Sequence, residues 1–184
     1  MRKVLGAFIA LGLMSGAALA GPKLAIEVQG DANGTVVIEL RDDLAPGHVA
    51  RIVSLAKDGA YDGVAFHRVI EGFMAQTGDV EFGKGADLSR AGMGGSKLPD
   101  LKAEFSTAPF ERGVVGMARS SSPNSANSQF FIMFAPAPHL NGQYTVVGQV
   151  VSGMEVVDSI KRGGGQSGAV RGTPDVMAKV TVQE

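Results

Sequence analysis

Short stretches in which apolar and polar residues alternate recur along this chain, and they constrain its fold more than any other feature. Residues 23–29 and 35–41 both alternate, and the turn-forming sequence QGDANG between them predicts an antiparallel hairpin. Further strand-like runs occupy residues 65–70, 73–77, 113–118, 129–134, 144–151 and 175–183. Since alternation puts every second side chain on one face, each run has a face that can be buried.

Helical periodicity is limited to two stretches. The first, residues 42–59, begins with two aspartates and Pro46 and closes with Asp-Gly. The second, residues 152–163, opens with Ser152 and Glu155 in the spacing of a capping box and closes with two basic residues and a glycine. Many short strands with only two helices predict a β-barrel or a β-sandwich, and closure into a barrel would remove the exposed sheet edges.

The N-terminal sequence MRKVLGAFIALGLMSGAALA, residues 1–20, has the layout of a secretory signal peptide. Its apolar run over residues 4–13 is shorter than the roughly 20 residues that a bilayer span needs, so a retained anchor is the lesser alternative. We therefore expect cleavage after Ala20, export to the periplasm, and no contact with the membrane afterwards. The remaining residues, 21–184, fit a single domain.

Composition and charge argue against several classes of function. The chain has 17 basic and 18 acidic residues, so it lacks the positive excess that binds nucleic acid. It contains no cysteine, which excludes disulfides and thiol nucleophiles. His48, His67 and His139 are widely separated and lack the spacing of a zinc site, and no serine lies in a G-x-S-x-G elbow. The glycine-rich residues 83–100 lack the lysine placement of a phosphate-binding loop and are interpreted as a long surface loop.

The stretch FHRVIEGFMAQTGD, residues 66–79, places an arginine among apolar neighbours. In a strand, alternation puts Phe66, Arg68 and Ile70 on one face, so the permanent cation of Arg68 lies on a largely apolar face. Such a charge is costly unless a carboxylate, a water-filled cleft or a ligand compensates it. The structural alternative is an arginine whose stem packs against the core while its head reaches water.

A second segment, QFFIMF at residues 129–134, alternates a mixed face with a fully apolar one. Gln129 and Phe131 share the mixed face, and taken alone this pattern fits an amphipathic strand with one buried face equally well. The two segments together predict an apolar pocket with a few hydrogen-bonding groups at its rim, as in a ligand site. The residues that would form this pocket are Arg68, Phe73, Met74, Gln76, Gln129 and Phe131.

These segments resemble the cyclophilins, which are peptidyl-prolyl cis-trans isomerases. The resemblance runs in order through residues 66–79, AEFS at 103–106, GVVGMARSSSPNSANSQFFI at 113–132 and LNGQYTVVGQVVSGMEVVDSI at 140–160. Several matching segments in a fixed order are far more specific than any single motif. The resemblance implies that residues 21–184 form a mainly β domain, a closed eight-stranded antiparallel barrel capped by two α-helices.

The resemblance also implies roles for the matching positions. Arg68 corresponds to the family's catalytic arginine. The wall and floor of the proline pocket correspond to Phe73, Met74, Phe131, Leu140 and Tyr144. The groups that hold the substrate chain and its surroundings correspond to Gln76, Ala118, Arg119 and Gln129. No cofactor and no metal are required by this chemistry.

Several positions depart from the family's pattern. Glu71 stands where the family often has proline, a turn position where the change should matter little. Arg119 stands where asparagine is usual, which leaves backbone binding intact but is expected to alter sequence preference. His139 stands where many members have tryptophan, which argues against tight binding of cyclosporin. Tyr144 replaces a frequent histidine and keeps the pocket floor aromatic.

The sequence therefore predicts a peptidyl-prolyl isomerase that acts on unfolded or partly folded exported proteins. The serious alternative is a catalytically weak chaperone module that binds proline-containing peptides in the same barrel, although binding alone has no need of Arg68. A barrel that carries a small molecule is a third interpretation, which the shallow pocket implied by the family disfavours. The expected partners are proline-containing polypeptides, with no nucleic acid and no membrane, and we expect a monomer.

Overall fold

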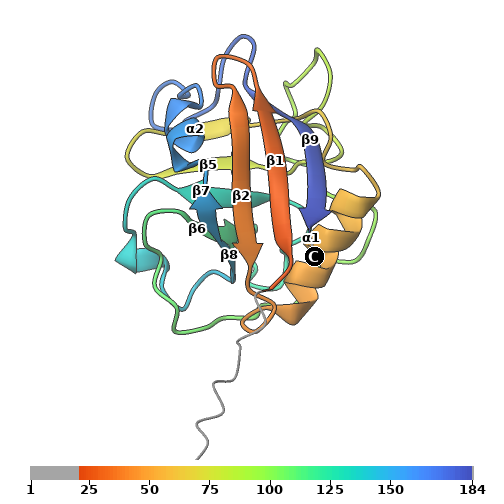
Figure 1. Cartoon of the computed structure of the whole chain (residues 1–184), viewed down its shortest axis with the longest axis vertical. Helices are drawn as coiled ribbons and strands as arrows, with labels where there is room; N and C mark the ends of the chain where they lie inside the picture. Colours follow the sequence, from red (N-terminus) through yellow and green to blue (C-terminus); the bar gives the residue numbers. More distant parts are fainter. Residues whose placement is uncertain (1–20, 184) are drawn as a thin grey trace, which may run out of the picture.

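The computed structural model describes residues 21–183, and the predicted signal peptide, residues 1–20, lies outside them. One antiparallel sheet contains β1 (Lys23–Gln29), β2 (Gly34–Leu40), β3 (Val64–Ala65), β4 (Arg68–Ile70), β5 (Met74–Thr77), β6 (Val114–Met117), β7 (Phe130–Met133), β8 (Val146–Ser152) and β9 (Val176–Gln183). The helices are α1 (Pro46–Lys57), the short 3-10 helix η1 (Pro138–Leu140) and α2 (Met154–Ser159). In Figure 1, α1 lies beside β9, and α2 lies at the opposite end of the sheet, near β2.

The sheet curls so that its two end strands are neighbours in the chain. The strand order is β3-β9-β1-β2-β8-β6-β7-β5-β4, and only Phe66 and His67 separate β3 from β4. The predicted mainly β fold, an antiparallel sheet with two α-helices, is confirmed. The strand count differs from the predicted eight, because the expected strand over residues 65–70 is interrupted. The Phe66 amide donates to the Asp175 carbonyl oxygen at 2.9 Å and the Phe66 ring is buried in the main core. Among the described residues β3 and β4 do not pair with each other, so the chain through Phe66 and His67, together with backbone hydrogen bonds to the segment before β9, joins the two ends of the sheet.

The first helix begins without a local cap. Ala45 occupies the N-cap position, and Asp43, which the sequence places at the helix start, pairs instead with Arg41 at 2.7 Å. The Glu104 carboxylate, distant in sequence, accepts hydrogen bonds from the backbone N–H groups of Gly47 and His48 at 3.1 and 3.0 Å. A remote carboxylate therefore satisfies the free N–H groups at the helix N-terminus.

The second helix is shorter than predicted. The expected capping box at Ser152 and Glu155 is wrong, because Ser152 ends β8 and Gly153 is the N-cap residue, with φ 83° and no side-chain cap. A Cβ atom at Gly153 would lie 2.2 Å from the Thr35 carbonyl oxygen. The chain must therefore turn tightly against β2 before the helix can start, and only glycine fits this approach.

Two groups of buried side chains pack on opposite faces of the strands that form the site. Phe130 and Ile132 of β7 lie in the main core, whereas Phe131 and Met133 lie in a second cluster. This division confirms the predicted alternation in β7. The second cluster contains Met74, Phe110, Val114, Phe131, Met133, Ala137, Leu140 and Val146.

Removing the remote cap should destabilise the protein. Glu104→Gln keeps the shape but loses the charge, so we expect a loss of about 1–2 kcal/mol in the free energy of unfolding at pH 7. Partial burial alone would raise the pKa of Glu104, but the hydrogen bonds from His48 and Gly47 lower it below its ordinary value. The contribution is therefore present above the pKa of the unfolded chain and is lost as the pH falls through the lowered folded pKa.

Urea unfolding of the two proteins between pH 7 and pH 3 measures this effect. The exposed Glu111→Gln serves as the matched control and should unfold like the parent protein. A Glu104→Gln variant as stable as the parent protein at pH 7 would contradict the capping role.

Candidate active site

Nine residues from three strands, the 3-10 helix η1 and the adjoining loops surround one hollow of about 180 Å³. They are Arg68, Phe73, Met74, Gln76, Ala118, Arg119, Phe131, Leu140 and Tyr144. The structure therefore brings together every predicted site residue except Gln129, which lines an adjoining hollow. Their catalytic and binding roles stay predictions at this point, since position alone does not establish them.

The register of the sheet aligns the polar and apolar sides of this pocket. Arg68 on β4 pairs with Gln76 on β5, Gln76 pairs with Phe131 on β7, and Phe131 pairs with Gly116 on β6. Residues directly opposite each other on neighbouring strands point to the same face. One row across four strands thus places the arginine, the amide and the aromatic ring side by side. A register slip of one residue in any of these strands would move its side chain to the opposite face of the sheet.

The Arg68 guanidinium is held from two sides by neutral groups. Its Nε–H donates to the Ser167 carbonyl oxygen at 3.0 Å, and its Nη1–H donates to Gln76 Oε1 at 3.2 Å. Within residues 21–183 no carboxylate forms an ion pair with it. The positive charge is therefore fixed in direction but not neutralised, and it lies at the rim of the pocket.

The prediction that Phe66 and Ile70 share one face with Arg68 is only partly correct. Ile70 packs at the edge of the second cluster, near the pocket, but Phe66 belongs to the main core because the strand is interrupted before Arg68. The simple alternation over residues 66–70 is therefore wrong at its first position.

Aromatic rings form the apolar wall of the pocket. Phe131 is 5% exposed and stacks on Phe110, with ring centroids 5.8 Å apart and planes at 23°. Tyr144 meets the Phe131 ring edge-on at 5.8 Å, and Phe73 stacks on His139 at 5.8 Å. These contacts fix the rings at the distances that favour aromatic pairs, so the wall is preformed. Sequence reasoning missed Phe110, which lies in the loop before β6, where no local pattern marks a buried aromatic side chain.

Glycine is required beneath this wall. A Cβ atom at Gly116 would lie 2.6 Å from Phe110 Cε1 and 2.6 Å from Phe131 Cζ. Any side chain at this position would displace these rings, which explains why β6 has a glycine within its buried sequence.

Arg119 lies where the pocket meets the adjoining hollow. Its guanidinium carbon is 4.3 Å from the centre of the Tyr144 ring, and its Nη2–H donates to the Gln143 carbonyl oxygen at 3.0 Å. A cation over an aromatic face is attracted by the ring. Arg119 therefore braces Tyr144 in addition to lining the rim.

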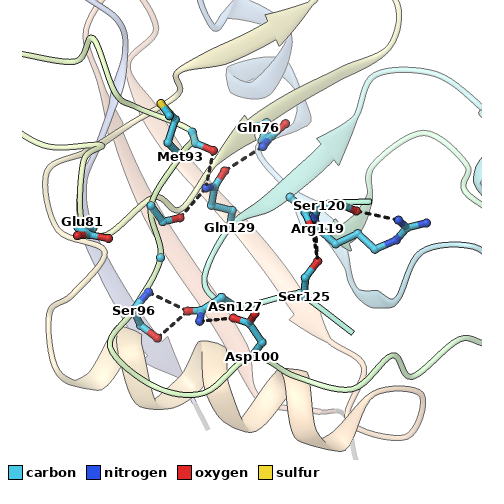
Figure 2. A pocket seen from close by; sticks show the side chains of 14 residues that line it. Gln76, Glu81, Met93, Ser96, Asp100, Arg119, Ser120, Ser125, Asn127 and Gln129 are labelled. Atoms are coloured by element: carbon cyan, nitrogen blue, oxygen red, sulfur yellow. Dashed lines mark hydrogen bonds between the residues drawn. The ribbon is translucent and has the colours of Figure 1, made fainter. Parts of the chain in front are cut away.

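The adjoining hollow measures about 390 Å³ and shares Gln76, Ala118 and Arg119 with the pocket (Figure 2). Part of the predicted surface loop, residues 92–96, forms one of its walls. Gln129 Nε2–H donates to the carbonyl oxygens of Gly92 and Gly94 at 3.1 and 2.8 Å, while Gln129 Oε1 accepts from Gln76 Nε2 at 2.9 Å. These backbone partners carry no side-chain signature, so sequence reasoning could not identify them.

The described residues contain few alternatives to this hydrogen-bonding chemistry. No group of three or more His, Asp or Glu side chains in residues 21–183 could hold a metal ion. In the same part of the chain no helix has the length and apolar character needed to cross a bilayer.

Comparison with known proteins identifies the family. The chain belongs to the cyclophilin family, because the family model described as "Cyclophilin type peptidyl-prolyl cis-trans isomerase/CLD" matches residues 23–182. A probable peptidyl-prolyl cis-trans isomerase of Brucella suis is 59% identical over 183 residues, covering 96% of this chain and 92% of the relative. A relative with the same description in Brucella abortus is 58% identical over the same length. The activity is therefore that of a peptidyl-prolyl cis-trans isomerase, EC 5.2.1.8.

Solved structures agree with this assignment. A cyclophilin from Hirschia baltica aligns with a TM-score of 0.70 at 26% identity, over 86% of this chain and 73% of that one. A cyclophilin type isomerase from Cryptosporidium parvum, solved in the presence of the dipeptide Ala-Pro, aligns with a TM-score of 0.75 at 24% identity, over 88% of this chain and 99% of that one. The second comparison supports the fold.

The histidine that precedes Arg68 makes the stability sensitive to acid. His67 is 9% exposed, and burial lowers its pKa from the ordinary 6.5, although the Asp79 carboxylate opposes this shift. The folded state therefore binds this proton less well than the unfolded chain, so stability is retained above pH 6.5 and falls as the pH drops from there toward the lowered folded pKa. We expect the free energy of unfolding, measured in urea at pH 7 and pH 5, to fall less in His67→Gln than in the parent protein. Equal losses in both proteins would contradict this assignment.

Proposed function

We propose that this cyclophilin accelerates rotation about X-Pro bonds in unfolded or partly folded exported proteins, with Arg68 as the catalytic residue. The observation that carries the proposal is the guanidinium held by two neutral oxygen atoms beside a pocket that has an apolar wall. A cation fixed in this way has charge available for a third partner. The pocket wall is made of rings and aliphatic groups of a size that suits a proline ring.

The chemistry needs neither a nucleophile nor a proton relay. Rotation about the X-Pro bond faces a barrier of about 18–20 kcal/mol because it breaks amide resonance. In the twisted amide the proline nitrogen regains a localised lone pair and can accept a hydrogen bond from Arg68. This bond is stronger in the twisted state than in either planar state, and such a difference is what lowers a barrier.

The rest of the site holds one side of the bond while the other turns. Phe131, Met74 and Leu140 are buried and offer a fixed apolar surface to the proline ring. Gln76 and the backbone near Ala118 lie at the rim, where the substrate chain would run. Excluding water from the amide also strengthens its contact with the cation.

Replacement of Arg68 tests the proposal. In a protease-coupled assay on a short X-Pro peptide, Arg68→Ala should lower kcat/KM by about 100- to 1000-fold, the usual effect of removing one preorganised donor. Arg68→Lys should recover little of this loss, because a single ammonium cannot bond both oxygen atoms and the substrate in the same fork geometry.

Arg41→Ala is the matched control, since Arg41 pairs with Asp43 at the surface and lies outside the pocket. It should keep the activity of the parent protein. The chaperone interpretation would be favoured instead if the parent protein bound the peptide while the isomerisation rate stayed at the uncatalysed value. Full activity in folded Arg68→Ala would remove the arginine from the mechanism.

Export is a separate part of the proposal. It is supported by the signal-peptide layout of residues 1–20, which has two basic residues, a short apolar run and small residues that end at Ala20. Cleavage after Ala20 would leave every described residue of the domain in place. Polypeptides arrive unfolded in the periplasm, and those whose folding is limited by slow prolyl isomerisation would then be the substrates.

The expected result of fractionating cells that express the full chain is a mature protein in the periplasm. Its N-terminal residue, read by mass spectrometry, should be Gly21. Recovery of the uncleaved chain in the cytoplasm or the membrane fraction would contradict export, and it would leave the catalytic role of Arg68 unaffected.

A further inference from the structure

A buried carboxylate lies behind the site, and the mechanism above does not use it. Asp79 is 0% exposed, and both of its oxygen atoms accept hydrogen bonds from backbone N–H groups. Oδ1 accepts from Glu81 and Phe82 at 3.1 and 2.9 Å. Oδ2 accepts from Gly92 and Gly94 at 2.7 and 2.9 Å. Four donors converge on a group that makes no ion pair among residues 21–183.

The segment that Asp79 holds is the one that orients Gln129. The N–H groups of Gly92 and Gly94 donate to Asp79, and the carbonyl oxygens of the same two residues accept hydrogen bonds from Gln129 Nε2. Figure 2 shows these two hydrogen bonds of Gln129. The position of the Gln129 amide therefore depends on where the carboxylate holds these two glycines. Only backbone stands between the two side chains.

The same chain of hydrogen bonds ends at Arg68. Because Gln129 Nε2 is engaged by the two carbonyl oxygens, Gln129 Oε1 faces Gln76 Nε2. This leaves Gln76 Oε1 to accept from Arg68 Nη1. An amide has a donor end and an acceptor end, so each member fixes the orientation of the next. With Gln129 reversed, Gln76 would turn its NH₂ group toward the guanidinium, and that contact would be repulsive.

The held segment fits closely on both sides. A Cβ atom at Gly94 would lie 2.6 Å from Asp79 Oδ1, and a Cβ atom at Gly92 would lie 3.0 Å from the His67 ring. Gly92 also has a φ of 95°, which side-chain-bearing residues rarely adopt. The segment therefore has little freedom to shift while Asp79 stays in place.

We propose that Asp79 is a positioning residue for the isomerase reaction, acting through the Gly92–Gly94 segment, Gln129 and Gln76 to hold the Arg68 guanidinium in its working direction. The inference rests on the catalytic role proposed for Arg68. Asp79 touches no substrate. Its effect is on the orientation of the cation and not on the apolar wall that holds the proline ring.

Asp79→Asn tests this role. The new amide keeps the shape but turns an N–H group toward backbone N–H groups, so the segment should shift. We expect kcat to fall by about 5- to 50-fold, in the range for misplacement of a catalytic group by a distant change, while KM and peptide affinity change less than about twofold. Asp87→Asn is the control. Asp87 is exposed, lies in the same connection between β5 and β6, and accepts a hydrogen bond from the Ser89 N–H, so the variant should keep the kcat of the parent protein.

To distinguish positioning of Arg68 from a purely structural role of Asp79, Asp79→Asn is repeated in a Gln76→Ala background. With the link to Arg68 already removed, Asp79→Asn should lower kcat by less than about twofold, because coupled residues are not additive. An equal loss of kcat in both backgrounds would overturn the proposal. A lower melting temperature with unchanged kcat would overturn it as well.

Gly94→Ala provides a second route if Asp79→Asn does not fold. It leaves the carboxylate in place but displaces the segment from it, and it should lower kcat in the same way and with the same dependence on Gln76. An unchanged kcat in folded Gly94→Ala would contradict the proposal. Arg68→Ala separates the catalytic role of Arg68 from the positioning role of Asp79. If Arg68→Ala has no effect on activity, the proposed function fails. If Arg68→Ala abolishes activity while the Asp79 and Gly94 variants are fully active, only the positioning role fails.

Discussion

The interaction on which the site depends is the grip of two neutral oxygen atoms on the Arg68 guanidinium. A carboxylate would hold the side chain more strongly, but it would also neutralise the charge and occupy the donors that the proposed mechanism directs at the twisted amide. The Ser167 carbonyl and the Gln76 amide fix the direction of the side chain and leave the cation uncompensated. Phe73 and Phe131 line the same pocket, and a substrate that fills it would exclude water and increase the effect of that charge.

The sheet makes this arrangement possible by bringing distant segments together. Ser167 lies 99 residues from Arg68, yet the 163–169 loop runs along the free edge of β4. The Val69 N–H bonds the Gly168 carbonyl oxygen at 2.7 Å, and the Gly163 N–H bonds the Val69 carbonyl oxygen at 2.9 Å. The edge strand that carries the arginine is thus covered, and the same loop supplies the acceptor for its side chain.

The sequence predicts the parts of this fold that depend on local patterns and misses those that depend on tertiary contacts. The division of β7 between two apolar faces follows from alternation alone. The break at Phe66 and the start of α2 at Gly153 arise from backbone contacts with remote strands, which no local pattern records. Arg68 and Phe131 stood out by their patterns, whereas Leu140 and Tyr144 could be placed only by resemblance to a family, since neither lies in a distinctive local pattern.

The most direct measurement of the central claim is the cis-trans exchange rate of a proline peptide while it is bound, obtained by NMR at saturating protein. In this state binding is complete, so the rate reports only on the turning of the bond. The account predicts that Arg68→Ala binds the peptide with similar affinity but exchanges the bound peptide at least about 100-fold more slowly than the parent protein. Equal bound-state exchange rates in the two proteins would contradict catalysis by the guanidinium.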